Sequence, residues 1–399
     1  MAKILIVVER FYPEDFLVND LAAEWKRQGH DVEVLTQVPS YPFDKIFDGY
    51  KNKTYQTTRE FNDIPVHRVS TIFGYNTSVK RKVLNYLHFA LLTSLWALWN
   101  GRKYDRVFVY HTAALTMAIA VVPLKWIWRK QITIWTQDLW PDAVWGFGFK
   151  PSKWKSALLN AFVRFIYGRC DRITVSCRRY VKRIKELTGR DAEWIPQWEP
   201  SCMELSPKDD NGKTVFMFAG NMGVPQNLDN VIAGYERAAL TDAELWLVGG
   251  GVMLEPLREK FGDVKGLKFC GRQPRAEMPK WFAQSDVLII SLTDKYCQTL
   301  PAKFQSYIKT GKPLFGILNG EANDLIKEFN LGCTSSPDNL DEIAAKFKAM
   351  TVMSRSGEGK ACGERAKVLS DKMFNRERSI ARLFGCADSG VWDESIEDV

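Results

Sequence analysis

The pattern that most constrains the fold is an alternation of short apolar runs with amphipathic stretches along most of the chain. Helical patterns lie between most of the apolar runs; one of them, "LVNDLAAEWKRQG", ends at Gly29. Continuous apolar runs are typical of buried parallel strands, and their alternation with helices predicts a doubly wound α/β sheet. The runs in the first half are "KILIVVE", "DVEVLT", "RVFVYH", "QITIWTQD" and "RITVS".

The alternation stops once and then starts again. Residues 195–213 contain three prolines and little periodicity, which is typical of a linker between domains. A chain of 399 residues also exceeds the size of one hydrophobic core. We therefore predict two Rossmann-like domains that face each other across a cleft, over residues 1–197 and 198–375. The apolar runs of the second domain are "TVFMFAG", "ELWLVGG", "LKFCG", "DVLIISL" and "PLFGIL".

Residues 376–399 are expected to leave the second domain. The stretch "KMFNRERSIARLFG" has a helical pattern, and we expect this helix to pack back on the first domain. The acidic tail "DSGVWDESIEDV" follows it and is expected to fray.

The composition argues against several classes of protein. The eight cysteines form no CxxC or CxxH pair, so we expect neither a zinc site nor a disulfide framework, and a reducing, cytoplasmic compartment. The N-terminal stretch "MAKILIVVER" enters a strand pattern directly and predicts no signal peptide. No His, Asp or Glu cluster has metal-ligand spacing, and no nucleic-acid-binding signature occurs. We therefore expect no metal, no cofactor and no nucleic-acid partner.

Basic and aromatic residues are interleaved in three stretches, 124–131, 149–169 and 178–185. Tryptophan beside Lys and Arg on one surface suits an anionic membrane interface, whereas core aromatics beside solvated charges are the alternative. The most apolar long run, residues 84–100, is shorter than the roughly 20 residues that span a bilayer. We expect a buried or interfacial helix there.

The stretch "QTLPAKFQSYIKTGKP" places a lysine close to the start of a predicted helix. The macrodipole already makes that end of a helix positive, so Lys303 is in an unfavourable position unless an anion binds there. Pro301 suits the first helical turn, and the free backbone N–H groups from Thr299 to Lys303 would face the same anion. We predict a diphosphate site; the alternative is a surface lysine that points to water.

Other candidate residues follow strands, because ligands of open α/β sheets bind beyond the carboxyl ends of the strands. The turn "FAGNMG" offers Gly220 and Asn221, and "LVGGGV" contains Gly249 and Gly250. Glycine lets the backbone approach a ligand closely, although a plain small-residue turn is the alternative. Glu321 follows another strand and either accepts sugar hydroxyls or caps the next helix.

The first domain has polar residues at the ends of three predicted strands. Asp138 ends "QITIWTQD", where a base for a hydroxyl nucleophile would be useful. His111 ends "RVFVYH" and is the one histidine at a plausible cleft edge. The loop after the first strand carries Glu14, Asp15 and Asn19.

Taken in order, these features resemble the GT-B-fold glycosyltransferases, specifically the family 4 retaining transferases of bacterial surface polysaccharide assembly. Within that family the chain is most similar to the O-antigen and colanic-acid transferases, including the L-fucosamine transferase type. The resemblance covers nearly the whole chain and rests on the order and spacing of several stretches. Among them are "FYPEDFLVNDLA", "WTQDLWPD", "FAGNMGVPQNLDNVI", "LVGGG" and "LPAKFQSYIKTGKPLFGILNGEANDLI".

The resemblance implies that the second domain binds a nucleotide-sugar donor and the first an acceptor. Asp138 and Lys303 are then the expected catalytic residues. The expected donor-binding residues, from the resemblance or from position, are Gly220, Asn221, Gly249, Gly250, Arg272, Gln298, Thr299, Lys303 and Glu321. The expected acceptor-binding residues are Glu14, Asp15, Asn19, His111 and Gln137.

The sequence departs from the family pattern at charged positions. Two glutamates often flank the lysine helix in this family, and Gln298 and Ser306 stand there instead. A histidine often precedes the aspartate that corresponds to Asp138; here it is Gln137, which cannot act as a base. Lys303 is therefore expected to supply more of the positive charge at the donor site than is usual.

We predict a retaining, metal-independent transferase that moves a hexose, N-acetylated or deoxy, from a UDP-sugar. The acceptor would be a hydroxyl of an undecaprenyl-diphosphate-linked saccharide in O-antigen, lipopolysaccharide or capsule biosynthesis. The enzyme would be cytoplasmic and peripheral on the anionic inner membrane surface. Two alternatives stay open at this point: a UDP-sugar 2-epimerase of the same architecture, and a non-catalytic membrane-associated partner in an assembly complex.

Overall fold

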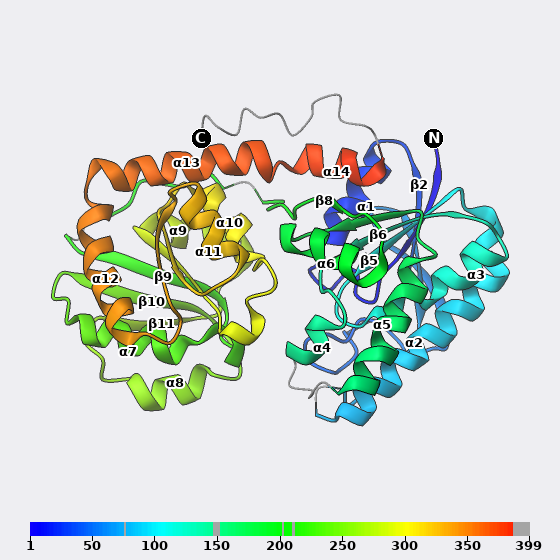
Figure 1. Cartoon of the computed structure of the whole chain (residues 1–399), viewed down its shortest axis with the longest axis horizontal. Coiled ribbons are helices and arrows are strands. Elements are labelled where there is room, and N and C mark those ends of the chain that lie inside the picture. The colour runs from blue at the N-terminus through cyan, green and yellow to red at the C-terminus, as the bar shows by residue number, and fades with distance from the viewer. Residues whose placement is uncertain (76, 147–151, 202, 210–211, 386–399) are drawn as a thin grey trace. The chain divides into compact units, whose positions relative to one another are not determined.

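The computed structural model describes residues 1–399 except 76, 147–151, 202, 210–211 and 386–399. The described chain divides into two compact units, Met1–Pro196 together with the chain from Ile380, and Gln197–Ser379. Each unit has its own sheet and its own hydrophobic core (Figure 1). The predicted acidic tail and part of the basic stretch 149–169 lie outside the described residues.

Unit 1 is built on an eight-stranded sheet with the order β3-β4-β2-β1-β5-β6-β7-β8. All neighbouring strands are parallel except β3 and β4, which form an antiparallel pair. The strands are β1 (Lys3–Val7), β2 (Asp31–Gln37), β3 (Tyr55–Phe61), β4 (Ile64–Val69), β5 (Arg106–His111), β6 (Gln131–Thr136), β7 (Arg172–Val175) and β8 (Glu193–Trp194). The helices are α1 (Leu17–Arg27), α2 (Val79–Asn100), η1 (Gly101–Lys103), η2 (Leu115–Ala120), α3 (Val121–Trp126), α4 (Asp142–Gly146), α5 (Lys153–Tyr167) and α6 (Arg178–Thr188).

Unit 2 has a six-stranded, fully parallel sheet with the order β11-β10-β9-β12-β13-β14. The strands are β9 (Thr214–Asn221), β10 (Ala243–Gly250), β11 (Leu267–Gly271), β12 (Val287–Ser291), β13 (Leu314–Ile317) and β14 (Gly332–Ser335). The helices are η3 (Val224–Gln226), α7 (Leu228–Ala238), α8 (Leu254–Phe261), η4 (Arg275–Glu277), α9 (Met278–Gln284), η5 (Asp294–Tyr296), α10 (Lys303–Thr310), α11 (Glu321–Glu328), α12 (Leu340–Ser354), α13 (Gly357–Met373) and α14 (Arg376–Phe384), which runs on into unit 1.

The two sheets confirm the predicted doubly wound α/β class, and each has a point where the strand order reverses. In unit 1 this point lies between β1 and β5, and in unit 2 between β9 and β12. Connections leave the two neighbouring strands in opposite directions there, which opens a crevice beyond their carboxyl ends. The residues that follow β1, β5, β9 and β12 are therefore placed where a ligand of such a sheet binds.

The C-terminal stretch forms two helices and not the single helix predicted for "KMFNRERSIARLFG". Helix α13 ends at Met373, and α14 begins at Arg376. The break is stabilised by Asn375, whose Oδ1 accepts a hydrogen bond from the backbone N–H of Arg378 at 2.9 Å. Asparagine is a favoured N-cap because its side chain satisfies an otherwise free amide of the first turn.

The end of α14 packs on unit 1. The Phe384 ring stacks on His30 at 4.3 Å between centroids, and the Arg106 guanidinium lies 4.6 Å from the Phe384 centroid. The guanidinium of Arg382 donates to Oε1 of Glu193 at 2.7 and 3.0 Å. These contacts fix the last described turn of the chain to the sheet of unit 1.

The end of β10 offers a matched pair of glycines for a stability test. A Cβ on Gly249 would lie 1.9 Å from the carbonyl oxygen of Gly220, and φ of Gly249 is +138°, whereas a Cβ on Gly250 would meet nothing within 4 Å. Overpacking of this kind typically costs about 1–3 kcal/mol. We expect Gly249→Ala to lower the unfolding free energy of unit 2 by about 2 kcal/mol or more, and Gly250→Ala to change it little. Urea unfolding of both variants measures this, and equal effects would contradict the close approach of β9 and β10.

Candidate donor and acceptor sites

Lys303 is the first residue of α10, which follows β12 at the point of reversal in unit 2. Its Nζ is buried and has no hydrogen-bond partner among the described residues. The ammonium lies 3.5 Å from the centroid of the Phe218 ring, and burial lowers the pKa of Lys303 to about 7. The alternative of a lysine that points to water is therefore wrong. A buried cation that has lost its water and found no partner is unfavourable until an anion binds beside it.

The sequence predicted Pro301 in the first turn of the helix, but the structure places it before the helix. Helix α10 begins at Lys303 with Ala302 as its N-cap, so Pro301 precedes the cap. The backbone N–H of Phe304 donates to the carbonyl of Pro301 at 2.9 Å. This tight turn takes up the amide of Phe304, and the predicted set from Thr299 to Lys303 is not part of it.

The glycines of the second unit lie at the ends of two strands, within the apolar runs "TVFMFAG" and "ELWLVGG" that predicted those strands. Gly220 and Asn221 end β9, and Gly249 and Gly250 end β10, with Gly249 opposite Gly220. A side chain at Gly249 would collide with the β9 backbone, so glycine there first serves the close approach of two strands. A Cβ on Gly220 would lie 3.5 Å from Nζ of Lys303. The structure thus brings Gly220 and Lys303 together, and the ammonium lies between the Gly220 backbone and the Phe218 ring.

The structure gives less support to the other candidate residues of the donor site. Arg272 follows β11 and is exposed, and Gln298 is exposed on the approach to α10. Thr299 donates its hydroxyl to the carbonyl of Tyr296 at 3.5 Å. Glu321 is buried as the first residue of α11. Their predicted roles toward a nucleotide sugar stay predictions.

Sequence reasoning missed Glu199, which the structure places against α10. Its carboxylate accepts hydrogen bonds from the Ser306 hydroxyl and, at 2.9 Å, from the Arg275 guanidinium. Burial acts to raise the pKa of Glu199, but these hydrogen bonds and the Arg275 charge outweigh it and hold the pKa below its usual value. Glu199 thus brings a carboxylate to Ser306, which follows Lys303 by one turn of α10. The sequence alone shows only a neutral serine at that position. Glu199 belongs to the predicted linker, 107 residues from Ser306, and no sequence signal connects the two.

Asp138 and His111 lie at the ends of the neighbouring strands β6 and β5. Oδ2 of Asp138 accepts a hydrogen bond from the backbone N–H of Ala113 at 2.9 Å, and burial raises the pKa of Asp138. His111 is fully buried, and burial lowers its pKa to about 3, so its ring is neutral near pH 7. Gln137 is also buried, and its backbone N–H donates to the carbonyl of His111 at 2.8 Å. Asp138 therefore shapes the loop after β5 in addition to any role toward an acceptor.

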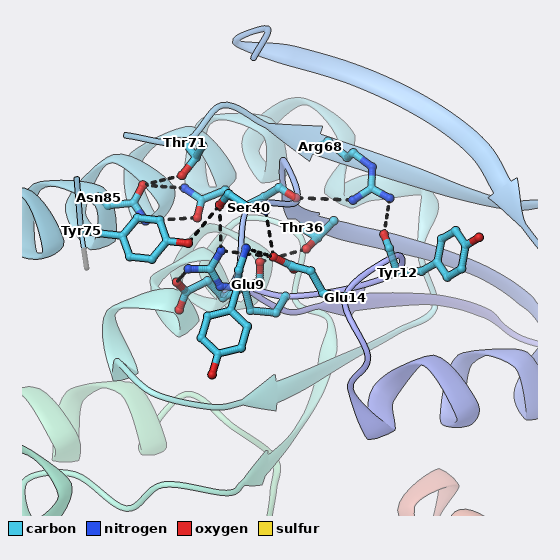
Figure 2. A network of polar contacts seen from close by, with 12 residues as sticks. Glu9, Tyr12, Glu14, Thr36, Ser40, Arg68, Thr71, Tyr75 and Asn85 are labelled. Carbon is cyan, nitrogen blue, oxygen red and sulfur yellow. Dashed lines mark hydrogen bonds and ion pairs between the residues drawn. The ribbon is translucent and has the colours of Figure 1, made fainter. Parts of the chain in front are cut away.

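The loop after β1 is held by a buried polar network (Figure 2). Oε1 of Glu14 accepts from the backbone N–H groups of Ser40 and Tyr41 at 2.9 and 2.7 Å and lies 3.4 Å from Arg10. Asn19 donates to the carbonyl of Glu14 at 2.7 Å. Oε2 of Glu14 is buried without a hydrogen-bond partner among the described residues, and burial raises the pKa of this carboxyl. Glu14 and Asn19 thus build the loop at the reversal of unit 1.

Glu9 connects this network to β2, because its carbonyl accepts a hydrogen bond from the Thr36 hydroxyl at 3.1 Å. Its carboxylate lies 3.3 Å from Arg10, and burial raises its pKa. Burial also raises the pKa of Tyr86, and the negative charges of Glu9 and Asp138 raise it further. Asp15, in contrast, is exposed.

The described residues contain no group of three His, Cys, Asp or Glu side chains that could hold a metal ion. They also contain no helix that is long and apolar enough to cross a membrane.

Both units match known glycosyltransferase families. Residues 17–196 match the family described as glycosyl transferase 4-like domain, and residues 213–351 match glycosyl transferases group 1. The chain is a glycosyltransferase with the GT-B fold. The predicted enzyme class is therefore confirmed, and the alternative of a non-catalytic partner is not supported.

Two relatives of this glycosyltransferase are themselves named as glycosyltransferases, and the name of one refers to colanic acid biosynthesis. It is 24% identical over 338 residues to the putative colanic acid biosynthesis glycosyl transferase WcaI of Escherichia coli, covering 77% of this chain and 81% of that one. It is 24% identical over 205 residues to the probable glycosyltransferase WbjE of Pseudomonas aeruginosa, a match that spans 47% of this chain and 51%, about half, of that relative.

Solved structures of low sequence identity share the fold. Sucrose-phosphate synthase from Thermosynechococcus elongatus has a TM-score of 0.71 at 12% identity, with 96% of this chain and 98% of that chain covered. Anabaena Alr3699/HepE in complex with UDP has a TM-score of 0.67 at 13% identity over the full length of both chains. WaaG, a glycosyltransferase involved in lipopolysaccharide biosynthesis, also has a TM-score of 0.67, at 14% identity over 96% of this chain and 100% of that chain.

The burial of Lys303 predicts a pH-dependent stability difference between the wild type and Lys303→Met. The folded pKa of about 7 lies below the value of 10.5 for a free lysine, so between these two pH values the unfolded chain binds more protons. The wild type should therefore gain stability relative to Lys303→Met as the pH rises from about 7 to about 10, and the variant should be the more stable protein near pH 7.

Denaturant unfolding at several pH values measures this difference. Lys327→Met, which removes an exposed lysine of α11, is the matched control and should show no such dependence. A difference between Lys303→Met and the wild type that stays constant with pH would show that the ammonium is hydrated.

Proposed function

We propose that this enzyme transfers a hexose, N-acetylated or deoxy, from a UDP-sugar to a hydroxyl of an undecaprenyl-diphosphate-linked saccharide, with retention of anomeric configuration and without a metal ion. The observation that carries the proposal is the buried, unpartnered ammonium of Lys303 beside Gly220. Its position at the reversal of strand order suits a diphosphate, the group that a nucleotide sugar presents there.

In this mechanism the groups of unit 2 stabilise the leaving diphosphate. Lys303 supplies a full positive charge in a site that excludes water, and the start of α10 adds the positive end of a helix dipole. Charge develops on the diphosphate as the sugar–oxygen bond breaks, so these groups bind the transition state more tightly than the ground state. Ser306 and its partner Glu199 are then placed to bind hydroxyls near the same helix.

Retention follows when the acceptor attacks from the face that the diphosphate leaves. The bond from the anomeric carbon to the diphosphate oxygen breaks, and a bond from that carbon to the acceptor oxygen forms on the same face. The acceptor proton passes to the departing diphosphate oxygen. Asp138 orients the acceptor hydroxyl by accepting its hydrogen bond before the proton is transferred to the diphosphate.

Several findings support the donor and acceptor classes. Anabaena Alr3699/HepE, which shares the fold, has been solved with UDP and with UDP-glucose. WcaI is named as a putative colanic acid biosynthesis glycosyl transferase, which supports a saccharide acceptor for the present enzyme. Both matched families are transferase families, which favours transfer over 2-epimerisation. We propose a peripheral position at the cytoplasmic membrane face because a lipid-linked acceptor resides there.

Removal of the lysine should abolish most donor turnover. A thermal-shift panel of UDP-sugars first selects the donor, because a ligand at large excess over its Kd raises the unfolding temperature. With that donor, Lys303→Ala should lower kcat about 10²–10³-fold, the usual loss when one charge-stabilising group is removed. Lys327→Ala serves as the control and should retain wild-type turnover. Near-wild-type turnover of Lys303→Ala would refute the diphosphate role of this lysine.

Donor binding should also take up a proton. With a pKa of about 7, Lys303 is partly neutral in the free enzyme above this pH, and a bound diphosphate raises its pKa. The affinity for UDP-glucose should therefore be greatest at or below about pH 7 and fall as the pH rises, since binding must then protonate the lysine. Calorimetry in buffers of different ionisation enthalpy measures the uptake. Lys303→Arg keeps its charge at every pH used, so its affinity should be independent of pH.

A further inference from the structure

The outward face of α2 is apolar along most of its length. Leu84, Leu87, Leu91, Leu95 and Trp99 follow one another at helical spacing, and each is at least 40% exposed. The opposite face of the helix is buried in the core of unit 1. A surface helix normally has polar side chains where these leucines lie, so an exposed apolar stripe of this length indicates a partner.

Helices α3 and α5 continue the same apolar face. On α5, Trp154 and Leu158 are 67% and 63% exposed, and on α3 Trp126 is 61% exposed. Trp126 meets Phe165 of α5 with 6.0 Å between centroids, and Trp128 donates its indole N–H to the carbonyl of Ala97 in α2 at 3.1 Å. Figure 1 shows the three helices gathered together beside the unit 1 sheet. Twelve of the twenty large apolar side chains exposed in the described chain lie on these helices or on Ile127, which directly follows α3, so the concentration is local.

The charged side chains of the three helices have one sign, although Lys125 of α3 pairs with Asp171 at 2.5 Å. Helices α2, α3 and α5 contain seven Lys or Arg and no Asp or Glu. Lys80 and Arg81 are exposed near the start of α2, and Lys153 and Lys155 near the start of α5. The guanidinium of Arg169 lies 3.5 Å from the centroid of Phe165. Leucine and tryptophan interleaved with cations match the depth profile of an anionic bilayer, with acyl chains below and phosphates above.

We propose that α2, α3 and α5 form a membrane-docking face, on which the apolar side chains enter the headgroup region of an anionic bilayer and the basic side chains contact its phosphates. The inference deepens the membrane position in the proposed function, but the docking itself does not require glycosyl transfer. Helix α6 is not part of this face, although its sequence predicted a contribution, because its apolar residues Tyr180, Ile184 and Leu187 are buried. The sequence also left open a buried helix at residues 84–100, and the exposed stripe corrects that alternative.

Co-sedimentation with vesicles tests the docking face. One set of vesicles contains phosphatidylglycerol and phosphatidylcholine in equal parts, and the other phosphatidylcholine alone. The wild type should bind the first at least tenfold more tightly than the second, with a strong dependence on salt. The double variant Leu87→Gln/Leu91→Gln and the double variant Lys153→Glu/Lys155→Glu should each lose at least tenfold in affinity for the anionic vesicles.

The controls distinguish docking by this face from non-specific binding of exposed apolar side chains and from the proposed catalytic role of Lys303. Val252→Gln/Val352→Gln removes two apolar side chains of unit 2 that are 79% and 72% exposed, and it should bind the vesicles like the wild type. Lys303→Ala should also bind them normally, whereas the two docking variants should keep wild-type affinity for UDP-glucose. Loss of vesicle binding with intact nucleotide binding therefore tests docking alone.

Two results would overturn the inference. The first is wild-type affinity for anionic vesicles in Leu87→Gln/Leu91→Gln. The second is that the wild type does not bind vesicles and sediments as a dimer, whereas Leu87→Gln/Leu91→Gln sediments as a monomer. A second copy of the chain would then be the partner of this face. Circular dichroism of each variant confirms that the substituted, exposed positions leave the fold intact.

Discussion

The reversal of strand order beside the first strand of each sheet is the constraint on which both candidate sites depend. Parallel strands must be joined by crossovers, and the crossovers leave β1 and β5, or β9 and β12, toward opposite faces of the sheet. The buried network around Glu14 in unit 1 and the ammonium of Lys303 in unit 2 both lie after these strands.

The burial of the Lys303 ammonium without a counter-ion is unfavourable in the free protein, and this is what makes the site suitable for an anion. The ammonium gives up hydration, receives only the face of Phe218 in return, and lies at the positive end of a helix. The close pairing of Gly220 with Gly249 fixes the backbone beside the ammonium, at a position that carries no side chain. The protein therefore holds the lysine side chain in place before a ligand arrives, and an anionic ligand offsets the free-energy cost of burying the ammonium.

The sequence predicted much of the fold and part of the site. The apolar runs located most central strands, and the spacing of Lys303 from the preceding strand indicated its position near the start of a helix. The antiparallel pair β3–β4 escaped the apolar pattern because β3 is largely exposed and alternates weakly. The break before α14 was missed because it depends on a single capping contact of Asn375.

The sequence by itself determined the doubly wound class, the loops that follow the strands and the presence of a lysine where a helix begins. Only the tertiary structure decided that this lysine is buried against Phe218 and that Glu199 reaches Ser306 across 107 residues. It likewise decided that the leucines of α2 face outward. Periodicity reports which residues share one face of an element, because it follows from local backbone geometry. Which face is then covered, and by which distant segment, depends on packing between elements, and no local pattern encodes that choice.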